Sequence, residues 1–216
     1  LTSNVGNFTS IQLTGYLAGA LTLISRSLLN SQNFNLTQFI VDHMAYAIKR
    51  FIEGELLNGT DEKVEGLSGV TITTTAAATN AITADEVIKL HDSIIDEFQG
   101  GAIWIMSRQT RTALRLLKDE MGRYMLQDDI SLPFGTSLLG KPVYVSDNMP
   151  EIAAGATPIY YGDMSGLATK WVEEMNIEVL REKYATQHAI GVVGWLEFDS
   201  KVENAQKIAK LTMAAE

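Results

Sequence analysis

The chain has 216 residues, of which 46% are hydrophobic, and its 26 acidic and 17 basic residues give a formal net charge of −9 at pH 7. It contains no cysteine, which excludes disulfides, thiolate metal sites and a cysteine nucleophile. The acidic balance argues against a surface built to grip nucleic-acid phosphates, because such a surface needs clustered Lys and Arg. A chain of this length buries a core large enough to fold without disulfides or structural metals.

The longest uncharged stretch is the first 25 residues, but its apolar part is interrupted by glycine and threonine. A membrane-spanning helix needs about 20 apolar residues. A secretory signal needs a basic start, whereas the first charged residue here is Arg26. We therefore expect neither a membrane segment nor a targeting segment.

Two patterns follow each other in the first part of the chain. Residues 8–29 are rich in Thr, Leu, Ile and Ser with loose alternation, which predicts one or two strands. From Leu36 onward, apolar residues recur at three- and four-residue steps, which is typical of one face of a helix. Asn35 is suited to cap this helix and Gly59 to end it, so the pattern predicts a helix over 35–58, about 33 Å long.

The middle of the chain breaks this regularity and then returns to it. Residues 59–82 are rich in glycine, threonine and alanine, and we interpret them as a connector between two lobes. Thr83 and Glu86 fit a capping box, which predicts a helix that includes His91 and ends at Gly100–Gly101. The run 102–106 is apolar at every residue, as in a central strand covered on both faces.

The remainder alternates turns and strands. Ser107 is suited to cap a second helix, Gly122 suits a left-handed position after it, and Pro142 opens a short strand over 143–146. Residues 158–161 and 167–172 flank the turn 162–166, which predicts a hairpin, and 177–181 and 190–198 resemble further strands. These elements predict an α+β protein in two lobes, one organised by the long helix and one by a small sheet with helices packed on it.

One segment partly matches a phosphate-binding loop. Gly135 to Lys141 has the loop's glycines and lysine, but Pro142 stands where Ser or Thr would supply a hydroxyl to Mg²⁺. A strand is expected after it rather than a helix, so no helix N-terminus would face the phosphate. A turn into a strand is the favoured interpretation.

We expect no catalytic, cofactor or metal site. His91 and His43 are expected at the edge of the core, and His188 has no nearby Ser or Asp signature. The acidic pairs Asp128–Asp129 and Glu173–Glu174 are interpreted as solvated turns rather than as a site for a hard metal ion.

Several segments, in order, resemble the major capsid proteins of tailed bacteriophages that have the Hong Kong 97-type fold. They are 104–110, 114–119 with 122–124, 138–150 and 159–163, preceded by a strand entering 25–29 and by the long helix. The order and spacing of these segments carry the resemblance, which covers nearly the whole chain. The motif residues that it implies, with structural roles, are Asp119, Gly122, Arg123, Leu139, Gly140, Pro142, Pro150, Gly162 and Asp163.

The resemblance implies an α+β Hong Kong 97-type capsid fold with a division into domains. Residues 1–69 would be the end of an extended loop region and a peripheral domain whose spine helix is 35–58. Residues 70–184 would be an axial domain with a small mixed sheet flanked by helices, and 185–216 would return to the peripheral domain. Most of the family's N-terminal arm and long hairpin loop is missing here. No crosslinking residue can be assigned, since the first lysine is Lys49, inside the spine helix.

The function implied is that of a head-shell protein of a phage or prophage. It would assemble with itself as hexamers and pentamers into an icosahedral shell in the bacterial cytoplasm and become part of the virion. The implied partners are scaffold, maturation protease and portal proteins, with packaged DNA enclosed without sequence-specific binding. The acidic charge fits a shell that does not hold its DNA tightly.

Two alternatives remain open from the sequence. The first is an encapsulin, a nanocompartment shell protein with the same fold that houses cargo enzymes instead of DNA. The second is a small α/β enzyme that binds a phosphorylated ligand through residues 135–141.

Overall fold

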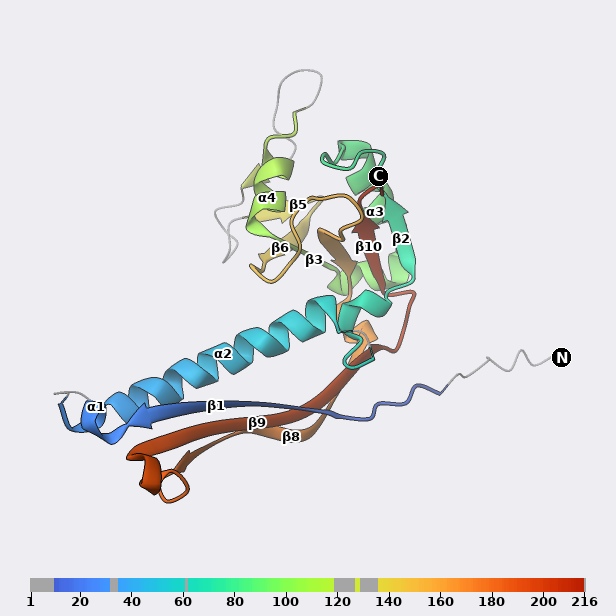
Figure 1. The fold of residues 1–216 in the computed structure, drawn as a ribbon. Helices are drawn as coiled ribbons and strands as arrows, with labels where there is room; N and C mark the ends of the chain where they lie inside the picture. The colour runs from blue at the N-terminus through green and yellow to red at the C-terminus, as the bar shows by residue number, and fades with distance from the viewer. Residues whose placement is uncertain (1–9, 32–34, 61, 119–126, 129–135, 216) are drawn as a thin grey trace.

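The computed structural model describes residues 10–31, 35–60, 62–118, 127–128 and 136–215. These residues form two bodies that meet near the C-terminal end of one long helix, α2 (Leu36–Asn58). We call them the helix-sheet body, which contains α2, and the seven-strand body (Figure 1). The predicted α+β organisation in two lobes is confirmed.

The helix-sheet body consists of α2 lying along one face of a three-stranded antiparallel sheet. The strand order is β1 (Tyr16–Ser25), β9 (Ala189–Val202), β8 (Leu167–Leu180). Met44 and Ile48 of α2 pack against Val192 and Leu196 of β9. Gly194 permits this close approach, because a Cβ there would lie 2.7 Å from the Ile48 Cδ1 atom.

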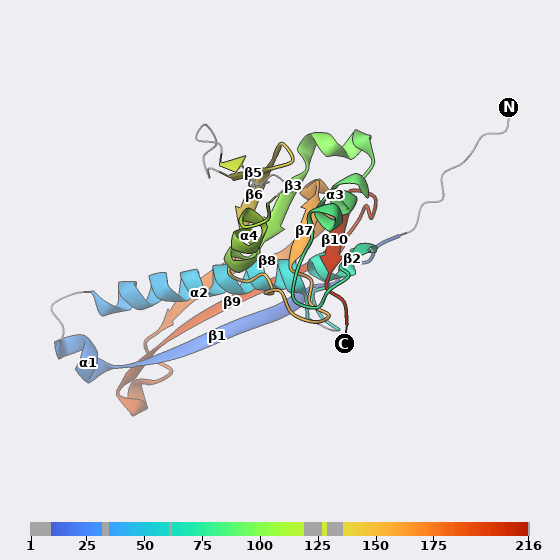
Figure 2. The same cartoon turned by 90° about the horizontal axis from the view of Figure 1, so that it is seen from above.

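The seven-strand body is a mixed sheet with helices packed on it (Figure 2). Trp104 and Tyr161 are fully buried at its centre, with their ring centroids 4.1 Å apart. Helices α3 (Ala84–Asp92) and α4 (Arg108–Arg115) contribute Val87, Leu90 and Leu114 to the same core. The strand order is β2 (Ile72–Thr75), β10 (Ile208–Thr212), β7 (Ile159–Gly162), β3 (Ile103–Met106), β6 (Lys141–Val145), β5 (Thr136–Leu138), β4 (Gln127–Asp128).

The joint between the bodies has its own apolar cluster and a set of polar contacts. Leu57, Leu67, Val70, Met149, Tyr160 and Ile208 are buried together there. On one side of it, the turn after β6 reaches α2: the Asn148 amide nitrogen donates to the Arg50 carbonyl (3.2 Å), and the Asn58 amide nitrogen donates to the Asn148 carbonyl (2.7 Å). These contacts fix the angle of α2 against the seven-strand body.

The predicted helix boundaries are confirmed where a capping side chain marks them. The Asn35 side chain accepts a hydrogen bond from the Gln38 N–H (3.2 Å), and Gly59 ends α2 with φ +68°. The Ser107 hydroxyl accepts from the Thr110 N–H (3.1 Å) at the start of α4. The capping box of Thr83 and Glu86 starts α3.

Five sequence-based predictions of elements are wrong. Residues 26–31 form a short helix, α1 (Arg26–Ser31), rather than more strand. The connector contains β2, which pairs in parallel with β10. α3 ends at Asp92, because Ser93 caps it with a hydroxyl hydrogen bond to the Leu90 carbonyl (2.6 Å), and 96–101 form a separate 3-10 turn, η2 (Asp96–Gly101). β7 and β8 do not form a hairpin, since they belong to different sheets, and 167–172 and 177–181 lie largely in one strand.

The two bodies do not coincide with the domain ranges expected from the sequence. β8 lies within the expected range 70–184 but pairs with β9 in the sheet beneath α2. β10 lies within 185–216 but pairs with β7 and β2 in the seven-stranded sheet. The chain therefore passes between the bodies at 163–166 and again at 203–207, rather than at residue 184.

The two-residue turn between β5 and β6 contains Leu139 and Gly140, with φ of +51° and +75°. Positive φ at both positions is the signature of a type I′ hairpin turn, which favours Asn-Gly. Leu139 is 44% exposed, so its side chain gains little from burial. We expect Leu139→Asn to raise the free energy of unfolding by about 1 kcal/mol and the melting temperature by about 2–4 °C. Leu139→Ile, which is β-branched, should lower both in the same calorimetric measurement.

Candidate assembly surfaces

Of the motif residues named from the sequence, those that the structure describes lie in different parts of the seven-strand body and the joint. Leu139, Gly140 and Pro142 lie in the β5–β6 hairpin, where Pro142 precedes the ladder between β6 and β3. Gly162 and Asp163 lie where β7 ends at the joint, and Pro150 follows the turn after β6. Asp119, Gly122 and Arg123 lie outside the described residues.

Asp163 caps the turn by which the chain leaves the seven-stranded sheet. Its carboxylate accepts from the Ser165 N–H (2.9 Å) and the Ser165 hydroxyl (2.7 Å), and Lys207 Nζ lies 3.8 Å away. These hydrogen bonds from Ser165, helped by the charge of Lys207, lower the pKa of Asp163 below its ordinary value of 3.8. Asp163 is thus the N-cap of the 3-10 turn η3 (Met164–Gly166).

The lowered pKa of Asp163 sets the sign of its pH dependence. Its stabilising contribution is present above the unfolded-state pKa and is lost as pH falls below about 3.8 through the lower folded value. We expect Asp163→Asn to cost about 1 kcal/mol of unfolding free energy at pH 7. The difference from wild type should shrink toward zero near pH 2, as urea titrations at both pH values would reveal. A cost that stays constant with pH would contradict the assigned role.

The segment compared with a phosphate-binding loop forms a hairpin. Over 136–145 the chain makes β5, a two-residue turn and β6, and a strand rather than a helix follows Lys141. Lys141 Nζ donates to the backbone carbonyl of Gln99, so it lies against the neighbouring 3-10 turn. Gly135 itself lies outside the described residues. The interpretation as a turn into a strand is confirmed for the described part.

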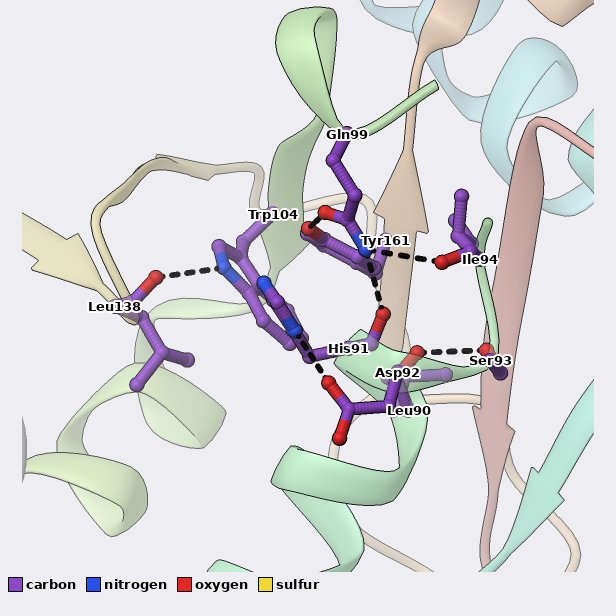
Figure 3. A network of polar contacts seen from close by, with 9 residues as sticks. All are labelled: Leu90, His91, Asp92, Ser93, Ile94, Gln99, Trp104, Leu138 and Tyr161. Carbon is purple, nitrogen blue, oxygen red and sulfur yellow. Dashed lines mark hydrogen bonds and ion pairs between the residues drawn. The ribbon is translucent and has the colours of Figure 1, made fainter. Parts of the chain in front are cut away.

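His91 lies at the edge of the core, as predicted (Figure 3). Its ring stacks on Tyr161 (5.2 Å between centroids), and its Nδ1 lies 2.8 Å from the Asp92 carboxylate. The Tyr161 hydroxyl bonds the Gln99 side chain, whose amide nitrogen donates to the His91 carbonyl (2.9 Å). Burial raises the pKa of Tyr161 to about 12. This network joins the end of α3 to the centre of the sheet.

His43 departs from its prediction. It is exposed on α2, where its ring stacks on Phe39 with centroids 6.4 Å apart. His188 takes a left-handed conformation, with φ +52°, before β9. Among the described residues, no group of three or more His, Asp or Glu side chains is placed to hold a metal ion. Within the same residues, no helix has the length and apolar character needed to cross a membrane.

The face of the three-stranded sheet opposite α2 carries exposed apolar side chains. They come from β1 and β9, and their exposed fractions range from 41% for Trp195 to 62% for Leu17. The Trp195 ring covers Gly19 of β1, where a Cβ would lie 2.3 Å from the ring carbon Cζ3. The side chains are Leu17, Leu21, Leu23 and Trp195. Sequence periodicity did not identify this face.

The two edges of this sheet differ in character. β1 has no charged residue, whereas β8 carries Lys170, Glu173, Glu174 and Glu178 and two irregularities in its register with β9. Charges and bulges protect an edge strand from pairing with other chains. Between β1 and α2 lies an apolar hollow of about 200 Å³ lined by Ala18, Gly19, Ala47 and Phe51, among others. The β1 side of the body is therefore suited to contact with another chain.

The chain belongs to the phage capsid family, whose model matches residues 2–213. It is 26% identical over 155 residues to the capsid polyprotein of Pseudomonas phage PAJU2. That alignment covers 65% of this chain but only 23% of the relative, so the chain spans less than a quarter of that protein.

Solved structures confirm the Hong Kong 97-type fold. The capsid of an empty GTA particle, computed with C5 symmetry, matches with a TM-score of 0.83 at 21% identity, over 100% of this chain and 80% of that one. The Gordonia phage Cozz structure matches with 0.71 at 11% identity, over 100% and 78%. The SrpI encapsulin complex of Synechococcus elongatus matches with 0.69 at 15% identity, over 93% and 73%.

Proposed function

We propose that this chain is the major capsid protein of a tailed phage or prophage and assembles with itself into an icosahedral shell around DNA. The observation that carries the proposal is the family match over 2–213, together with a fold shared along the whole chain with a GTA capsid. The subunit then acts as a structural component of the virion without catalysis. Assembly takes place in the bacterial cytoplasm, with scaffold, protease and portal proteins as partners.

The two bodies acquire domain roles under this proposal. The helix-sheet body is the peripheral domain, with α2 as its spine, and the seven-strand body is the axial domain that meets its copies around fivefold and sixfold axes. The polar contacts of Asn148 with α2 support a fixed angle between the two, which repeated subunits need in order to build a shell of one curvature.

The test is to express the complete gene product in bacteria, with and without the neighbouring head genes, and to image it by negative-stain electron microscopy. Closed shells or rings of five and six subunits are the expected result. A product that stays monomeric in both settings, at high concentration, would refute the proposal.

The encapsulin alternative is supported by the match to the SrpI structure. The two candidates differ in what the shell would contain. Nuclease-protected DNA in purified shells is expected for a phage capsid. Shells that contain a co-purifying enzyme and no nucleic acid would instead establish an encapsulin.

A further inference from the structure

Helix α4 carries a stripe of positive charge in a protein whose net charge is −9. Arg108, Arg111 and Arg115 follow each other at steps of three and four residues, which places them on one side of α4. Lys118 lies three residues beyond the end of the helix. All but Arg111 are exposed, and the adjoining Leu116 is 65% exposed. Two acids, Asp147 and Glu151, line a hollow with Arg108 at one end of the stripe.

Helix α3 and the turn η2 carry the opposite charge. Asp85, Ile88 and Asp92 follow at steps of three and four residues on the exposed side of α3, and Ile88 is 40% exposed. Exposed Asp96 and Glu97 continue the acidic surface on η2, beside Ile95, which is 52% exposed. Lys89 is the exposed cation of α3, while His91 turns inward onto Tyr161.

The two surfaces lie toward opposite ends of the seven-stranded sheet. α3 packs on β2 and β10 at one end. α4 connects β3 to the parallel strand β6 nearer the other end. Both helices contribute to one core on the same face of the sheet, and both views show them apart on that layer (Figures 1 and 2). A subunit thus presents a basic and apolar side and an acidic and apolar side in different directions.

We propose that the α4 surface of one copy docks on the α3–η2 surface of the next copy. Leu116 of one subunit then packs between Ile88 and Ile95 of its neighbour, and the arginines of α4 meet the carboxylates of α3 and η2. A contact between two different surfaces is heterologous, and such contacts form a ring when the rotation between neighbours closes. This inference rests on the proposed function and specifies which side chains select the neighbour within a capsomer; charge sets its orientation and register.

The test reverses the charges one side at a time and then on both. The variants are Arg108→Glu with Arg115→Glu on α4, Asp85→Lys with Asp92→Lys on α3, and all four together, which leaves the net charge at its original −9. Each single-side variant should reduce the fraction of subunits in rings by about tenfold or more at low salt. The four-fold variant should restore rings and shells. Circular dichroism and thermal melting establish that each variant is folded.

A mixture of the two single-side variants gives a sharper outcome. Each variant can contact only the other through these surfaces, so the two must alternate around a ring. Alternation closes only rings with an even number of subunits. The mixture should therefore form six-membered rings but no five-membered ones, giving sheets or tubes instead of closed shells.

Leu116→Asp provides a second variant in case charge reversal unfolds a helix, since the substituted side chain is largely exposed in the subunit. A Leu116→Asp variant that folds but no longer forms rings supports the proposal. If wild type assembles and all of these variants assemble equally well, this inference fails while the proposed function stands. If wild type never assembles, the proposed function itself fails. Variants of α4 that assemble normally but no longer retain duplex DNA would overturn the proposal and assign the stripe to the packaged DNA.

Discussion

Gly162→Ala is expected to prevent folding or to lower the free energy of unfolding by about 4 kcal/mol or more. Gly162 has φ +141°, and a Cβ there would lie 2.1 Å from the Lys207 carbonyl oxygen. That carbonyl accepts the Asp163 N–H hydrogen bond (3.0 Å), so it cannot move away without breaking the corner where β7 ends. A fall in melting temperature of about 8–16 °C, or loss of soluble protein, is the expected readout.

Gly100→Ala is the matched control for Gly162→Ala. No atom lies within 4 Å of a Cβ built at Gly100, and its φ is not in the left-handed range. Its melting temperature should stay within about 2 °C of wild type. Equal effects of the two substitutions would show that glycine entropy, rather than the crowded corner, accounts for the loss.

Glu86→Ala is expected to cost about 3 kcal/mol of unfolding free energy. The Glu86 side chain is buried, and its two oxygens accept the N–H groups of Thr83 and Ala77 at 2.7 Å each. Alanine would leave both backbone donors without their carboxylate partner. The substitution would release the start of α3 from the end of β2, and urea unfolding would measure the loss.

The pH dependence of stability distinguishes the contribution of the Glu86 charge from that of an uncharged side chain of the same size. Burial raises the pKa of Glu86, but the hydrogen bonds from Thr83 and Ala77 outweigh this and hold it below its ordinary value of 4.5. The contribution is therefore present above about pH 4.5 and is lost as pH falls through the lower folded value. Glu86→Gln keeps one acceptor oxygen, so it should lower the free energy of unfolding at pH 7 by about half as much as Glu86→Ala. Because glutamine does not titrate, its contribution should not fall at acidic pH.

Local signals in the sequence predicted α2 and the starts of α3 and α4 well. The period of apolar residues, the capping side chains of Asn35 and Ser107 and the backbone of Gly59 define α2 and the start of α4, because each acts within one or two helical turns. The central strand β3 was also predicted, since a buried strand is apolar at every position.

Pairing between distant strands could not be predicted in the same way. β2 is a short run rich in threonine whose partner, β10, lies more than 130 residues away. The turn at 162–166 has the composition of a hairpin, but β7 and β8 separate there into different sheets. Turn chemistry specifies a change of direction and not which strand will lie alongside.

The candidate surfaces likewise combine features that the sequence reveals with features that only the structure reveals. The spacing of Arg108, Arg111 and Arg115 can be recognised in the sequence. That the acidic residues of α3 and η2 lie toward the other end of the same sheet can be seen only in the structure. The exposed leucines of β1 read as core residues in the sequence, because alternation does not reveal which face another layer covers.

The position of β9 has a consequence for when the subunit completes its fold. β1 pairs with β9 along its whole length, from Tyr16 with Phe198 to Ser25 with Ala189. At bacterial rates of synthesis of about 5–20 residues per second, β1 waits on the order of ten seconds or more for its partner to leave the ribosome. During this time an uncharged strand of high β propensity has no native neighbour, so a chaperone is most useful in this interval. The pairing of β1 with β9 beneath α2 can therefore be completed only after residue 198 has been synthesised.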